Sequence, residues 1–125
     1  MNLDYWFDTK LDSKTITVQL FGELYLVDFV KVNSEFRQKA LKSNLSIIFD
    51  FRATNNQIFF NQINYLKEFV YITQFDNSKH LPVVHLINIK DKYIFDFIEV
   101  IANDNGLFVN TFYDELSAIE WLKQF

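Results

Sequence analysis

The first clear alternation along the chain is that of Ile16, Val18 and Leu20 with polar side chains. This period of two predicts a half-buried strand. A short aromatic run at residues 5–10 precedes it across a polar turn at residues 12–14. The two runs are therefore predicted to form a β-hairpin.

A helical pattern follows the hairpin. Phe29, Val32, Phe36 and Ala40 recur at steps of three, four and four, so they share one face of a helix. Asp28 is the expected N-cap, because its carboxylate can accept the free N–H groups of the first turn.

The next element is a nearly continuous apolar run at residues 45–51, which predicts a strand covered on both faces. Asp50 lies near its end. Short polar side chains compete for backbone hydrogen bonds and favour loops. A loop is therefore predicted for the polar residues that follow, Thr54, Asn55, Asn56 and Gln57.

Residues 58–75 predict a helix with an unusually wide apolar surface and only a narrow polar stripe. A sheet normally covers only part of the circumference of a helix. This helix must therefore bury a second side elsewhere or expose it.

The rest of the chain predicts a strand at residues 81–87, a helix at 92–103, a strand at 107–112 and a final helix capped by Asp114. Asn105-Gly106 ends the first of these helices, because glycine adopts a left-handed conformation at little cost. In the final helix, Leu116, Ile119 and Leu122 are expected to point inward. The resulting β-β-α-β-α-β-α-β-α order predicts an α/β fold with a mixed, mainly parallel sheet.

Composition narrows the classes of function. The length of 125 residues suits a single domain at residues 1–125, and the 50% hydrophobic content is ample for its core. Fifteen Phe and six Tyr make the chain unusually aromatic, and such a surplus of rings can belong to the core or form a contact surface for a partner or an apolar ligand. The net charge of −4 and the lack of a basic block argue against binding to nucleic acid.

Location in the cell is also indicated by what the sequence lacks. It contains no Cys, which fits a cytoplasmic protein. No apolar run is long enough to predict a transmembrane segment, and residues 1–10 do not resemble a signal peptide. We therefore expect a cytoplasmic protein.

Three segments, in this order, resemble those of the STAS domain (sulfate transporter and anti-sigma factor antagonist). FGEL at residues 21–24, followed by a Phe- and Val-rich helix, is similar to the strand–Gly-x-Leu–helix opening of the family. IIFDFR at residues 47–52 is similar to its strand ending in an aspartate. FYDELSAIEWL at residues 112–122 resembles its closing helix. The resemblance covers nearly the whole chain and is greatest to single-domain, SpoIIAA-like members.

One departure from this family affects function. Its regulatory members carry an Asp-Ser-x-Gly element after the strand aspartate, and a partner kinase phosphorylates the Ser. Here that position falls near residues 58–61, which contain no Ser, Asp or Gly, and the nearest hydroxyl is that of Thr54. The resemblance thus implies a scaffold that binds a partner or a ligand, without the phosphoserine switch.

The candidate site residues each allow a structural alternative. Asp50 can be a functional carboxylate at the carboxyl end of a parallel strand, or it can cap the following loop. The loop of Thr54, Asn55, Asn56 and Gln57 can bind a polar ligand or an anion, or it can merely connect two elements. The rings of the next helix, Phe59 and Phe60 among them, can line an apolar pocket or a dimer face, or belong to the core.

No residues indicate catalysis, a metal or a cofactor. His80 and His85 are expected to be structural, because zinc sites use tighter sets of ligands. The sequence contains no Gly-x-Ser-x-Gly elbow, no Cys nucleophile and no His-Glu-x-x-His.

Three hypotheses of function follow. The leading one is a non-enzymatic module that binds a protein partner, or a second copy of itself, through the Asp50–Gln57 loop and the aromatic helix after it. The alternative is a carrier or sensor of a small apolar, lipid-like ligand. The third is an enzyme, which would need a cleft with paired carboxylates of raised pKa.

Overall fold

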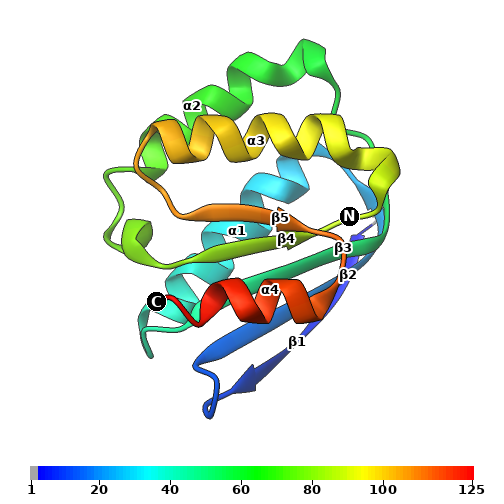
Figure 1. Ribbon diagram of the computed structural model, residues 1–125. Coiled ribbons are helices and arrows are strands. Elements are labelled where there is room, and N and C mark those ends of the chain that lie inside the picture. The colour runs from blue at the N-terminus through cyan, green and yellow to red at the C-terminus, as the bar shows by residue number, and fades with distance from the viewer. Residues whose placement is uncertain (1–2) are drawn as a thin grey trace.

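The computed structural model describes residues 3–125 and contains one five-stranded sheet with the order β1-β2-β3-β4-β5 (Figure 1). β1 and β2 are antiparallel, and every other neighbouring pair is parallel. The strands are β1 (Leu3–Lys10), β2 (Thr15–Leu24), β3 (Ser46–Asn56), β4 (Val83–Leu86) and β5 (Val109–Phe112). The predicted α/β class, element order and mainly parallel sheet are therefore confirmed.

Four helices cover the two faces of this sheet unequally. They are α1 (Leu26–Leu41), α2 (Ile63–Thr73), α3 (Lys92–Asp104) and α4 (Glu115–Leu122), with short 3₁₀ turns η1 (Phe60–Gln62), η2 (Asn77–His80) and η3 (Ile89–Asp91). Buried residues of α1, α2 and α3 belong to one large core cluster. Those of α4 form a smaller cluster with β3 and β4 (Figure 1). Three helices thus pack on one face and α4 on the other.

The predicted inner faces of β2 and α1 meet in the larger cluster. Its members include Ile16, Val18, Leu20, Phe29, Val32, Phe36 and Ala40, all at most 2% exposed. Their burial follows from the period-two and helical spacings, which place them on one side of each element.

An aromatic cluster occupies the centre of this core. The ring of Phe51 lies 5.2 Å from that of Phe95 and 5.6 Å from that of His85, measured between centroids. Phe29 and Phe49 stack on Phe51 at 5.8 and 5.9 Å. Neither ring nitrogen of His85 has a hydrogen-bond partner. The expected structural role of His85 is therefore that of a neutral ring within an aromatic core.

Two predicted helix boundaries are confirmed. The Asp114 carboxylate accepts a 2.8 Å hydrogen bond from the Ser117 backbone N–H and caps α4. Gly106 follows α3 with a φ of +81°, a conformation that favours glycine.

The boundary between β3 and the following segment was predicted wrongly. β3 continues to Asn56, so Thr54, Asn55 and Asn56 belong to a strand and only Gln57 lies beyond it. These residues pair with Gly22–Leu24 of β2. Parallel pairing with β2 overrides the turn preference of the polar side chains.

Two helix starts also differ from the prediction. α1 begins at Leu26, and Asp28 lies buried within its first turn instead of capping it. α2 begins at Ile63, five residues late, because both backbone groups of Ile58 bond to the Asn56 side chain ahead of the helix.

One side chain of α4 that was predicted to point inward is exposed. Leu116 is 82% exposed, whereas Leu122 and Ala118 are buried against β3 and β4. The helix is only two turns long, so its apolar stripe is too short to bury all of the predicted positions.

Candidate functional site

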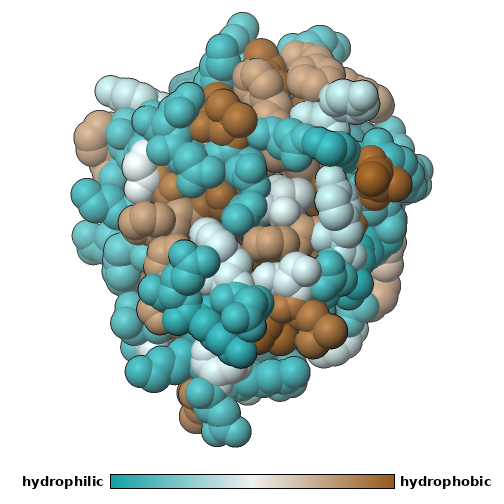
Figure 2. All heavy atoms as spheres, in the orientation of Figure 1, coloured by the Kyte–Doolittle hydropathy of each residue, from teal (hydrophilic) through white to brown (hydrophobic). Residues whose placement is uncertain are grey.

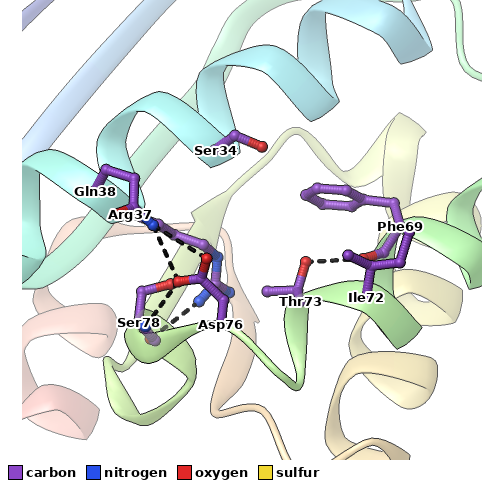
Figure 3. A pocket seen from close by; sticks show the side chains of 8 residues that line it. All are labelled: Ser34, Arg37, Gln38, Phe69, Ile72, Thr73, Asp76 and Ser78. Atoms are coloured by element: carbon purple, nitrogen blue, oxygen red, sulfur yellow. Dashed lines mark hydrogen bonds between the residues drawn. The ribbon is translucent and has the colours of Figure 1, made fainter.

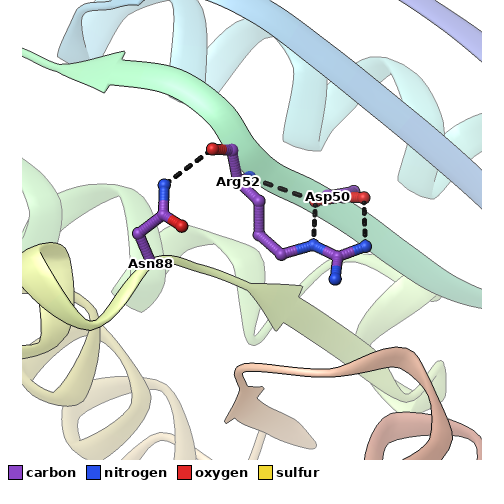
Figure 4. Close-up of polar contacts among 3 residues, drawn as sticks. All are labelled: Asp50, Arg52 and Asn88. Atoms are coloured by element: carbon purple, nitrogen blue, oxygen red, sulfur yellow. Dashed lines mark hydrogen bonds and ion pairs between the residues drawn. The ribbon is translucent and has the colours of Figure 1, made fainter.

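Asp50 lies on the face of the sheet that carries α4, paired with Arg52 two residues later in β3 (Figure 4). Its carboxylate accepts hydrogen bonds from the Arg52 backbone N–H and from Nε and Nη2 of the same side chain, at 2.9–3.0 Å. Asn88 donates to the Arg52 carbonyl oxygen at 2.6 Å. Donating hydrogen bonds to the Asp50 carboxylate raises the pKa of Arg52. Asp50 therefore fixes the Arg52 side chain within the strand.

Thr54 is buried, with 5% exposure, and its hydroxyl donates to the Phe51 carbonyl oxygen at 2.7 Å. A kinase cannot reach a hydroxyl in this position without local unfolding. The hydroxyl nearest to the expected switch position is thus part of the core.

The amides of Asn55 and Gln57 both bind one carboxylate at the end of β2. Asn55 donates to the two oxygens of Glu23 at 3.2 and 3.1 Å, and Gln57 donates at 2.8 Å. Sequence reasoning missed Glu23, because its role depends on the parallel register that places it beside Asn55. With the Asn56 amide bonded to Ile58, all three amides make internal hydrogen bonds.

Phe59 and Phe60 lie just beyond this polar cluster and are 56% and 55% exposed. With Tyr93, which is 80% exposed, they line a hollow of about 180 Å³. Phe60 also contacts Phe97 of α3 edge-on, with ring centroids 6.2 Å apart. We call Phe59, Phe60 and Tyr93 the aromatic edge.

The second apolar side of α2 is exposed. Leu66 and Val70 are buried, whereas Tyr65 and Ile72 are 68% and 60% exposed. Between α1 and α2 lies a groove of about 660 Å³, which we call the α1–α2 groove. It is lined by Tyr25, Leu26, Val27, Val30, Gln62, Tyr65, Glu68, Phe69 and Ile72.

A polar cleft of about 320 Å³ adjoins this groove and shares Phe69 and Ile72 with it (Figure 3). Arg37 of α1 and Asp76 contribute its charges. Sequence reasoning missed this cleft. The one sequence feature that indicates it is the position of Arg37 next to Phe36, within the apolar face of α1.

Figure 2 shows one face of the molecule, in the orientation of Figure 1, with mostly hydrophilic atoms and hydrophobic groups in separate areas. Exposed apolar side chains gather at the aromatic edge and along the α1–α2 groove, which are therefore candidates for a binding surface.

Residues 3–125 contain no group of three or more His, Cys, Asp or Glu arranged to hold a metal ion. Within the same residues, no helix has the length and apolar character required to cross a membrane.

Comparison with known proteins identifies the fold. No protein-family model and no curated protein matches the sequence. An uncharacterized protein from the DUF3478 family with a SpoIIAA-like fold, from Shewanella loihica PV-4, is similar in structure with a TM-score of 0.56 and 14% identity, over 97% of this chain and 94% of that one. An anti-sigma factor antagonist from Mycobacterium paratuberculosis gives a TM-score of 0.52 at 10% identity, over 98% and 95%. The chain therefore has a SpoIIAA-like α/β fold, as its resemblance to STAS domains implied.

Proposed function

We propose that this chain is a non-enzymatic interaction module that binds a protein partner through the aromatic edge, without a phosphoserine switch. The observation that carries the proposal is the exposure of Phe59, Phe60 and Tyr93 around one hollow. Aromatic side chains provide large contact areas and dominate the binding energy of many protein interfaces.

The surroundings of the aromatic edge support this assignment. The adjacent Asn55 and Gln57 amides bind Glu23 internally, so they are not free to bind a polar ligand beside the rings. Burial of Thr54 supports the absence of a switch at that position. One structural neighbour is named an anti-sigma factor antagonist, a description that refers to action on another protein.

Photo-crosslinking followed by reconstitution tests this proposal. A photoreactive phenylalanine analogue at Phe59 is expected to crosslink one specific protein in cells that express the chain. The same analogue at Leu116, which is 82% exposed on α4, is the matched control and should not crosslink it. With the purified partner, Phe59→Ser should raise the Kd by roughly tenfold or more, whereas Leu116→Ser should leave it unchanged.

Equal labelling from both positions, or an unchanged Kd for Phe59→Ser, would contradict the proposal. A crosslink between two copies of the chain would assign the surface to self-association instead. Sedimentation of the purified protein, before and after Phe59→Ser, measures that outcome directly.

A second candidate function is favoured by the α1–α2 groove: transport or sensing of a small apolar ligand. The groove volume of about 660 Å³ lies within the usual range for small-molecule sites, and most of its lining is apolar. Val27, which is 71% exposed, offers a way to block it.

Native mass spectrometry with dodecan-1-ol as the probe tests the second candidate. The unmodified protein is expected to bind one molecule, and Val27→Trp should reduce the bound fraction by filling the groove. Val100→Trp, on the exposed side of α3, is the matched control and should bind normally. Protein that takes up no dodecan-1-ol, or equal uptake by all three proteins, would exclude this function.

A further inference from the structure

Arg37 is a charged side chain buried without a direct ion pair, although the charge of Asp76 acts on it. It is 4% exposed, and its closest hydrogen bond is a long one of 3.4 Å from Nη1 to the Ser78 carbonyl oxygen. Nε is buried and has no partner. Among residues 3–125, no carboxylate lies within ion-pair distance of the guanidinium. Burying a charge in this way is costly unless an ion or a set of hydrogen bonds compensates for it.

Asp76 is the nearest candidate for that compensation, but other groups hold its carboxylate. Ser78 N–H donates to it at 2.8 Å, and the Gln38 amide donates at 3.0 and 3.2 Å (Figure 3). Hydrogen bonding from Ser78 lowers the pKa of Asp76, so it stays ionised. Burial lowers the pKa of Arg37 to about 10, which leaves it protonated at neutral pH.

Arg37 lines the polar cleft of about 320 Å³ together with Asp76, and its Nη1 makes only one long hydrogen bond there. Ser34, one helical turn earlier in α1, lines the same cleft and presents its hydroxyl toward it (Figure 3). An Arg fork and a hydroxyl that line the same cleft suit a carboxylate, which accepts paired hydrogen bonds from a guanidinium.

The apolar groove continues directly from this cleft. Stepping back along α1 from Arg37 by three, four and three residues reaches Ser34, Val30 and Val27, so these side chains form one stripe. The stripe is about 15 Å long at the usual rise of an α-helix. A polar end and an apolar body along one path match an amphiphile with a single charged head.

We propose that Arg37 is the anion-binding residue of a site for an amphiphilic monocarboxylate. Its carboxylate would bind Arg37 and Ser34, and its apolar tail would lie in the α1–α2 groove. This inference rests on the second candidate function and adds the chemical class of the ligand.

Isothermal titration with dodecanoate and dodecan-1-ol tests the assignment, since the two probes share a tail and differ in the head group. The unmodified protein should bind dodecanoate roughly tenfold or more tightly than the alcohol. Arg37→Met keeps the length and apolar stem of the side chain, and should remove this preference while retaining binding of the alcohol. Circular dichroism establishes that the variant is folded.

Equal affinity of the unmodified protein for both probes would overturn the assignment, and this measurement does not depend on any variant. Retention of the carboxylate preference by Arg37→Met would overturn it as well. Should Arg37→Met fail to fold, Arg37→Lys, which keeps the charge but loses the fork, is expected to reduce the preference. If the protein binds the alcohol without preferring the carboxylate, the carrier function is still supported. If it binds neither probe, both the carrier function and the carboxylate site are excluded.

Discussion

Replacing Phe51 with alanine is expected to lower the free energy of unfolding by about 3–5 kcal/mol, the usual effect of removing a buried aromatic ring. Phe51 is 1% exposed, and its ring contacts four others, those of Phe29, Phe49, His85 and Phe95. The surrounding rings come from α1, β3, β4 and α3, so the cavity cannot close without moving several elements.

Urea unfolding followed by circular dichroism measures this change. Phe59→Ala is the matched control, because Phe59 is 56% exposed, and its effect should stay within about 0.5 kcal/mol. Similar losses for the two variants would show that Phe51 is not the centre of the core.

Lowering the pH from about 7.5 to about 5 is expected to reduce the His85 contribution to stability by about 2 kcal/mol. Burial, and then the charge of Arg37, lower the pKa of His85 from 6.5 to about 3. The unfolded chain therefore binds a proton below pH 6.5 that the folded protein does not accept. The free energy of unfolding falls as the pH falls through the window from about 6.5 to about 3.

His85→Phe isolates this effect, since a phenyl ring fits the aromatic cluster and does not titrate. Carboxylates such as Asp76, whose pKa is lowered, contribute equally to both proteins. The free energy of unfolding of the unmodified protein, minus that of the variant, should fall by about 2 kcal/mol between the two pH values. A difference that is independent of pH would contradict the neutral, buried state of His85.

The order of elements could be predicted because local signals agree with tertiary structure. Three of these signals depend on only a few neighbouring residues: the alternation of Ile16, Val18 and Leu20, the Asp114 cap, and the end of the helix at Gly106. The extension of β3 could not be predicted in this way. Its polar end at Asn55 and Asn56 is held by pairing with β2, and the partner residues lie about 30 positions earlier.

The candidate site could also be predicted only where local sequence signals exist. The wide apolar surface of residues 58–75 indicated exposed rings, and Phe59 and Phe60 are exposed. The Arg37 cleft gave no comparable signal, because η2 covers α1 from a segment 41 residues later in sequence. A charged residue on an apolar helix face becomes informative only when the element that buries it is known.

The sequential strand order has a consequence for how the sheet can form. Each strand pairs with its immediate successor, so closing each pair orders at most one helix and its connections. Loop-closure entropy is therefore kept low at every step. During synthesis, each strand that leaves the ribosome would find its partner already present, and none would have to be inserted between two others.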